Sequence, residues 1–208
     1  ETLRGRSPLY AINGIPQSTP MRDGSRDGFT IDGFFVDRVE LIYGSNALQG
    51  IGGTGGIVNQ VTVGAPKQEG LGGRFLLQGT ADNDFSGDGI GGKVAGLIQY
   101  RAGRFDATFG AAWEKRGAFY DGEGRRVGLN LTQGETQDSK TLSLFARLGY
   151  ELSDTARLDL IASRFELKGD GDYVAIAGNR TLGIPTSAVR GTPPGESAQN
   201  RTESVALS

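Results

Sequence analysis

Hydrophobic and polar residues alternate with a period of two through most of the chain after Leu71. Successive side chains of a β-strand point to opposite faces, so this alternation predicts strands with one apolar and one polar face. Several runs exceed the roughly five or six residues of a usual soluble strand. The predicted strands cover residues 74–79, 93–100, 105–114, 141–152 and 157–163, and a sixth begins at Glu203.

The connections between these predicted strands alternate in length. Residues 101–104 and 153–156 form tight turns, whereas residues 81–92, 117–139 and 168–201 are long, polar and rich in glycine and aspartate. Short turns on the periplasmic side and long external loops are typical of outer-membrane barrels. The pattern therefore predicts a transmembrane antiparallel β-barrel in contact with a lipid bilayer.

A soluble antiparallel sandwich is the alternative interpretation of the same strands. The two differ in whether the apolar face of Phe75, Ile98, Phe109 and Leu144 meets lipid or a second sheet. Six strands cannot close a barrel, and an open sheet edge in lipid leaves backbone groups unpaired. The barrel interpretation therefore requires further strands after Ser208, and we expect the chain to be a fragment of a longer protein.

Residues 1–67 have a different character and are compact and rich in turns. A short apolar strand at residues 9–12 precedes Asn13-Gly14, a strong tight-turn signal. Strands predicted at residues 36–43 and 56–63 flank a glycine-rich connection. Glycine is favoured where backbone turns sharply or packs against other backbone, which predicts structural roles for the following residues. They are Gly44, Gly50, Gly55 and Gly56.

Composition excludes much enzyme chemistry. The 208 residues include no cysteine and no histidine, which excludes disulfides, thiolate nucleophiles and imidazole acid–base groups. The 22 basic and 24 acidic residues are nearly balanced. A protein that binds nucleic acid is expected to carry a clustered basic face, so this balance gives no argument for a nucleic-acid partner. We expect no catalytic residues, no metal site and no cofactor, and hence no enzyme.

One short motif suggests a nucleotide site and fails on its context. Gly50, Gly52 and Gly55 match the G-x-G-x-x-G spacing of dinucleotide-binding loops. That fingerprint requires a helix directly after it, with the pyrophosphate at the helix N-terminus. Residues 57–63 are rich in β-branched side chains and predict a strand instead.

Several segments of the first third resemble the plug domain of TonB-dependent outer-membrane receptors. They are Arg4-Gly5-Arg6, residues 10–16 (YAINGIP), residues 37–44 (DRVELIYG), residues 47–50 (ALQG) and residues 55–59 (GGIVN), in that order. The resemblance implies a small α+β plug, truncated at its N-terminus, at residues 1–67 and the first five to six strands of an incomplete barrel at residues 68–208. Such a plug sits inside a barrel of about 22 strands.

The resemblance also implies a function in the bacterial outer membrane. Such receptors import scarce ligands, most often ferric siderophores and sometimes cobalamin, haem or saccharides. The TonB complex of the inner membrane supplies the energy. A passive β-barrel channel, or a soluble or surface-attached β-rich binding protein, remains an alternative function.

The resemblance further suggests ligand-binding and latch residues. In such plugs the loop after the Asn-Gly turn faces the external cavity, which makes Gln17, Arg22 and Arg26 candidate ligand contacts. Guanidinium groups pair well with anionic oxygens, although neighbouring aspartates could simply balance both arginines in a solvated loop. Arg38 and Glu40 share one face of a strand, where similar plug residues pair with the barrel wall. They are candidate latches, or else a surface ion pair of little energetic weight.

Overall fold

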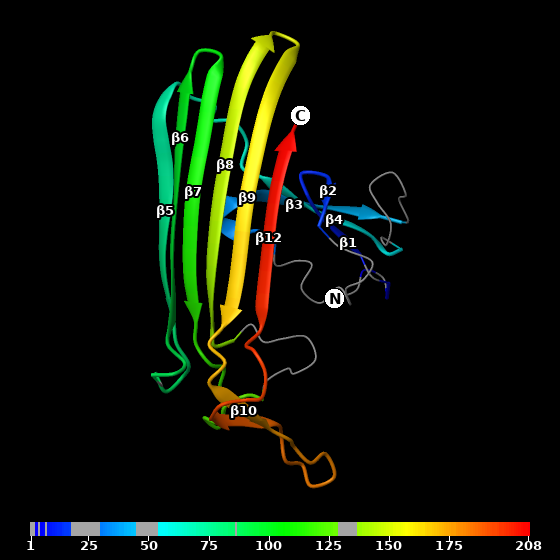
Figure 1. Ribbon diagram of the computed structural model, residues 1–208, viewed down its shortest axis with the longest axis vertical. Helices are drawn as coiled ribbons and strands as arrows, with labels where there is room; N and C mark the ends of the chain where they lie inside the picture. The colour runs from blue at the N-terminus through cyan, green and yellow to red at the C-terminus, as the bar shows by residue number, and fades with distance from the viewer. Residues whose placement is uncertain are drawn as a thin grey trace.

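The protein forms two main sheets and a separate two-stranded hairpin (Figure 1). The computed structural model describes residues 3, 5–6, 8–17, 30–44, 54–85, 87–128 and 137–208. Strands account for nearly all regular structure in this part of the chain, and a single 3-10 turn accounts for the rest. The predicted β fold class is confirmed, and the arrangement is that of a partial barrel wall with a small folded module beside it.

The large sheet is an antiparallel meander of six long strands. In spatial order it runs β12-β9-β8-β7-β6-β5, and tight turns join β6 to β7 and β8 to β9. Strands lie where the alternation predicts them, although β9 extends further than expected. Their bounds are β5 Gly70–Thr80, β6 Gly91–Ala102, β7 Phe105–Arg116, β8 Ser139–Ser153, β9 Ala156–Gly169 and β12 Gln199–Leu207.

The small sheet and a 3-10 turn form an N-terminal module, which comprises residues 8–17, 30–44 and 54–64. Its strands are β1 Leu9–Ile12, β2 Ile15–Pro16, β3 Val36–Tyr43 and β4 Gly56–Thr62, and the turn is η1 Gly33–Phe35. The order is β2-β1-β4-β3. Asn13 and Gly14 both have positive φ, of 51° and 81°, as a tight turn between β1 and β2 requires. Strand β1 pairs in parallel with β4, a long-range pairing that local pattern does not reveal.

The module packs against one face of the large sheet, here called the inner face (Figure 1). The opposite, outer face carries the exposed apolar side chains of the alternation. Phe75 is 86% exposed, and Ile98, Phe109 and Leu144 are also exposed. No second sheet covers this face in the part of the chain that the structure describes, which argues against a sandwich.

The inner face is apolar where the module covers it. Phe35 lies at the centre of a core that also contains Leu97 and Phe145, with Ile161 packed against it. The alternation assigns Leu97, Phe145 and Ile161 to the polar face of their strands. They are apolar because the module excludes water there, and burial of apolar surface stabilises the contact.

The long connection between β9 and β12 contains a hairpin that the sequence pattern does not predict. Its strands are β10 Tyr173–Ile176 and β11 Ser187–Arg190. Each has only four residues, too few for a clear alternation. The hairpin lies at the end of the large sheet where the long loops gather (Figure 1). Among the described residues, no helix has the length and apolar character needed to cross a membrane.

Candidate functional site

The contact between the two sheets centres on the short segment that leads into β3. Asp32 caps the 3-10 turn, because its Oδ1 accepts a hydrogen bond from the Phe34 N–H at 2.8 Å. The Phe35 N–H donates to the Asp32 carbonyl at 3.0 Å. Aspartate favours such local bonds to nearby N–H groups. The cap turns the chain so that Phe35, with no exposed surface, points into the interface.

Asp32 also joins the module to the large sheet through a buried ion pair. Its Oδ1 lies 2.6 Å from Nζ of Lys93 on β6, and the two side chains are only 5% and 16% exposed. The Asp32 N–H donates to Oγ of Ser143 on β8 at 3.3 Å. Removing one member of a buried ion pair leaves an uncompensated charge. Loss of either Asp32 or Lys93 should therefore destabilise the contact between the two sheets.

Two phenylalanines of the module fill the rest of the interface. The Phe35 ring stacks on Phe145 of β8, with centroids 5.5 Å apart. Gly110 on β7 leaves room for it, since a Cβ there would overlap the Phe35 ring. Nη2 of Arg74 on β5 donates to the Phe34 carbonyl at 2.6 Å, and its guanidinium lies 4.9 Å from the Phe34 ring centroid. Residues of three strands of the large sheet, β5, β7 and β8, thus contact the two rings.

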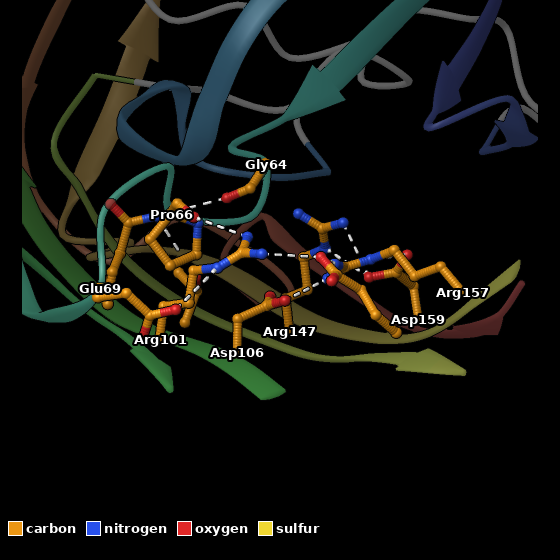
Figure 2. A network of polar contacts seen from close by, with 11 residues as sticks. Gly64, Pro66, Glu69, Arg101, Asp106, Arg147, Arg157 and Asp159 are labelled. Carbon is orange, nitrogen blue, oxygen red and sulfur yellow. Dashed lines mark hydrogen bonds and ion pairs between the residues drawn. The ribbon is translucent and has the colours of Figure 1, made fainter. Parts of the chain in front are cut away.

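Inward-pointing charges form a second feature at the short-turn end of the sheet (Figure 2). Arg157 on β9 lies 2.5 Å from Asp106 and 2.8 Å from Asp159. Arg147 on β8 lies 2.8 Å from Asp159. Charge-assisted bonds of this kind are shorter and stronger than neutral ones. We call the set the inner-wall network; its members are Arg101, Asp106, Arg147, Glu151, Arg157 and Asp159.

A third polar cluster ties together the loops at the opposite end of the sheet. The Tyr173 hydroxyl donates to Asp88 at 2.5 Å, and Arg190 of β11 contacts Asp88 and also Asp172, the latter at 2.6 Å. Arg126 lies over the Tyr173 ring. These residues come from three different loops, so the cluster holds the hairpin against its neighbours.

Burial raises the pKa of the Asp138 carboxyl, beside this loop cluster, and a hydrogen bond with Asp172 raises it further. A raised pKa means that the folded loops favour the protonated carboxyl. The Arg126 guanidinium lies 3.4 Å from the Asp138 carboxylate, and its positive charge opposes this rise in the pKa.

Several known proteins are similar in sequence to this chain. The chain is 33% identical over 175 residues to the rhizobactin receptor of Rhizobium meliloti (strain 1021). It is 31% and 30% identical over 194 residues to the ferric aerobactin receptors of Klebsiella pneumoniae and Escherichia coli. The chain is a homologue of TonB-dependent siderophore receptors. The resemblance seen in the sequence is thereby confirmed.

The aligned regions include most of this receptor homologue but only part of each relative. The matches span 83% of the chain with the rhizobactin receptor and 91% with each aerobactin receptor. They span 23% and 25% of those proteins, so the chain spans about a quarter of their length. No protein-family model matches the chain.

The candidate latch residues of the receptor homologue contact each other. Nη2 of Arg38 lies 2.8 Å from Glu40, and Glu40 accepts a further bond from Asn59 at 3.0 Å. The hydrogen bond from Asn59, and then that from Arg38, lowers the pKa of the Glu40 carboxyl. Both side chains are partly exposed. Arg38 faces a cavity of about 470 Å³ that Lys93 also lines, so a latch role for the pair stays a prediction.

The predicted ligand contacts are placed only in part. Gln17 lies just after β2, where its N–H donates to the Tyr10 carbonyl at 2.8 Å and its side-chain amide donates to the Ile15 carbonyl at 3.1 Å. Arg22 and Arg26 lie outside the described residues. Contact of these three side chains with a ligand therefore stays a prediction.

The predicted structural glycines occupy contrasting positions. Gly44 has a positive φ of 92°, and an added Cβ there would meet nothing within 4 Å. Gly55 and Gly56 lie where an added Cβ would meet backbone carbonyl oxygens of Arg6 and Ile42. This close approach supports the packing role predicted for them. Gly50 lies outside the described residues.

Sequence reasoning missed the residues that join the two sheets. Asp32 and Lys93 lie 61 positions apart, and nothing local links them. The aspartate before Gly33-Phe34-Phe35 is a capping signal that can be recognised in the sequence. Its second role, as the partner of Lys93 in an ion pair, cannot be recognised there. The inner-wall network carries a clearer signal, since Arg101, Asp106 and Arg157 all lie beside the predicted tight turns on the polar face.

Proposed function

We propose that this receptor homologue takes part in the uptake of a ferric siderophore across the bacterial outer membrane. The observation that carries the proposal is a folded module fastened to the inner face of a sheet whose outer face is apolar and exposed. An outer-membrane barrel presents apolar side chains to lipid in this way. Residues 1–67 would then be a plug and residues 68–208 the first strands of the barrel wall.

The ligand class comes from the relatives. They are named for rhizobactin and for ferric aerobactin, and we propose an iron–siderophore complex of that kind as the ligand. Capture would take place on the side of the long loops, at the plug loop that carries Gln17, Arg22 and Arg26. Two guanidinium groups in that loop would attract an anionic complex.

Transport would require the module to leave the inner face. The Asp32–Lys93 pair and the Phe35–Phe145 stack hold it there, and both must separate to open a path along the wall. We propose that the TonB complex of the inner membrane supplies the work. The protein would act as a transporter and would catalyse no covalent step.

Iron uptake in living cells tests this proposal. The full-length receptor would be expressed in a bacterium without its own siderophore receptors, and radioactive iron would be supplied as ferric aerobactin or rhizobactin. Saturable uptake that disappears when TonB is inactivated is expected. A strain with an empty vector controls for leakage.

The alternative functions give different results in the same experiment. Uptake that persists without TonB and does not saturate would identify a passive channel. A protein that fractionates away from the outer membrane and stays soluble without detergent would identify a β-rich binding protein. Either result would contradict the proposal.

A further inference from the structure

The inner-wall network reaches the segment that connects the module to the large sheet. This linker, residues 63–69, leaves β4 and enters β5. Nε2 of Gln99 donates to the Gly64 carbonyl at 3.4 Å, and Nη1 of Arg101 donates to the Pro66 carbonyl at 3.3 Å. The Glu69 carboxylate accepts from the Gly103 N–H at 3.1 Å. The linker is therefore fastened to β6 and to its tight turn at three successive points (Figure 2).

Carboxylates hold the arginine at the centre of these contacts. Nη2 of Arg101 lies 2.8 Å from Glu151 on β8, and Glu151 also contacts Arg157 at 3.5 Å. Arg157 in turn contacts Asp106, whose side chain is only 2% exposed. Alternating charges thus cross four adjacent strands, and each orients the next. This support preorganises the Arg101 guanidinium toward the linker carbonyl.

Arg147 approaches the same linker from β8. Its Nη1 is buried and has no hydrogen-bond partner among the described residues. A Cβ built on Gly64 would lie 3.6 Å from that atom, so the guanidinium lies directly beneath the linker backbone. Asp159 holds its other nitrogens at 3.1 and 2.8 Å.

The two attachments of the module lie at opposite ends of one strand. Lys93, which binds Asp32, and Arg101, which binds the linker, lie eight residues apart on β6, or about 27 Å along a strand. Near the Lys93 end the module is held by the Asp32–Lys93 ion pair and by the Asp32 N–H bond to Ser143, whereas the Phe35–Phe145 stack lies midway along β6, at the level of Leu97. The Arg101 end depends on several coupled charges that orient Arg101, and on bonds from Gln99 and Arg101 to backbone carbonyls of the linker.

We propose that Arg101 and Arg147 are positioning residues that keep the linker docked to the wall during transport. The module then moves about the linker and opens at its Asp32–Lys93 end. The proposal rests on the uptake function proposed above, and it adds where the moving module stays attached.

Reversible cross-linking in the full-length receptor tests this arrangement. The 208 residues contain no cysteine, and any cysteine elsewhere would be replaced. One variant carries Asp32→Cys with Lys93→Cys, and the other carries Gly64→Cys with Gln99→Cys. Each is joined by a short reducible thiol reagent, and iron uptake is measured before joining, after joining and after reduction. Siderophore binding to the cells is measured in parallel.

The two cross-links are expected to differ. Joining residues 32 and 93 should slow uptake by about tenfold or more while binding remains, whereas joining residues 64 and 99 should change uptake by less than about twofold. Equal inhibition by both would overturn the linker attachment, and inhibition by neither would overturn the opening at Asp32. Loss of binding and uptake in the unmodified receptor would instead contradict the proposed function.

Point variants give an independent readout. Arg101→Ala should slow uptake without changing siderophore affinity, and Arg101→Lys should restore part of the rate, since one ammonium can still donate to the Pro66 carbonyl. Arg104→Ala is the matched control, because Arg104 donates to the Leu152 carbonyl at the end of β8 and not to the linker. A rate for Arg101→Ala equal to that of the control would overturn the role of Arg101.

Discussion

The Asp32 carboxylate lies 2.6 Å from the Lys93 ammonium, across the interface between the N-terminal module and the large sheet. Both side chains are mostly buried, and Asp32 also caps the turn that carries Phe35 into the core. One aspartate therefore sets both the local shape of the module and its attachment to the wall.

Breaking this pair from one side should loosen the module. Lys93→Met leaves the Asp32 charge buried, which typically costs about 3–5 kcal/mol. Urea unfolding of the detergent-solubilised full-length receptor would measure the loss. Lys140→Met is the matched control, since the Lys140–Asp170 pair is 2.7 Å long but far more exposed, and exposed pairs contribute only about 0–1 kcal/mol.

The double variant Asp32→Asn with Lys93→Met separates charge from capping. Asparagine keeps an oxygen that can cap the turn, and no buried charge remains. This variant should recover most of the stability that Lys93→Met loses. A double variant as unstable as the single one would show that the ion pair is not the cause.

Gly110 should tolerate no side chain, because Phe35 lies directly over it. Gly110→Ala forces the ring or the strand to move, and such overpacking typically costs about 1–3 kcal/mol. Gly96→Ala is the control on the neighbouring strand, where an added Cβ meets nothing within 4 Å. Equal thermal stability of the two variants would contradict the placement of Phe35.

Ile98 should be sensitive to charge because it belongs to the exposed apolar outer face. An arginine on the lipid-facing side of a barrel costs about 2–4 kcal/mol at the bilayer midplane. Ile98→Arg should therefore reduce the amount of receptor assembled in the outer membrane. Gln78→Arg is the control, since Gln78 pairs with Lys93 on the inner face, and assembly should stay near that of the unaltered receptor.

The pKa of Glu40 should depend on Asn59. Asn59 donates to Glu40 and accepts from the Gly14 N–H at 2.8 Å. Asn59→Ala should raise the Glu40 pKa back toward its ordinary value, because the hydrogen bond from Asn59 is the largest single cause of the lowering, and Arg38→Gln should also raise it, because Arg38 contributes a hydrogen bond and a positive charge. Titration of isotope-labelled glutamate by NMR would measure both shifts. A Glu40 pKa that stays unchanged in Asn59→Ala would contradict the role of the Asn59 hydrogen bond.

The same shift has a defined sign in the pH dependence of stability. The folded state has the lower pKa, so it binds fewer protons than the unfolded state between the lowered and the ordinary value. The stabilising contribution of Glu40 is thus present above the ordinary glutamate pKa and lost as the pH falls through the lowered one. Asn59→Ala should weaken this dependence.

Tyr173 should control the docking of the β10–β11 hairpin. Tyr173→Phe keeps the ring beneath the guanidinium groups and removes the bond to the Asp88 carboxylate, a net loss of about 1.5–3 kcal/mol for a typical hydrogen bond to a charged group. Faster hydrogen exchange over residues 173–190 is expected. Tyr150→Phe, on the outer face of the large sheet, should leave exchange in the hairpin unchanged.

The sequence by itself determined where most strands lie and which way their outer side chains point. Strands β1 and β3 begin and end at the predicted residues, and Asn13-Gly14 forms the predicted turn. These features depend on neighbours in the chain: alternation places side chains on two faces, and positive φ suits asparagine and glycine. Phe75 and Ile98 could therefore be assigned to one face without any knowledge of the fold.

Only the tertiary structure decided what the inner face contacts. Leu97 and Phe145 occupy positions that the alternation marks as polar, and they are apolar because Phe35 arrives from a distant segment and excludes water. The partner of Lys93 could not be predicted for the same reason. Ion pairs and packing between distant segments depend on how the two sheets meet, and that geometry is a property of the whole fold rather than of any local pattern.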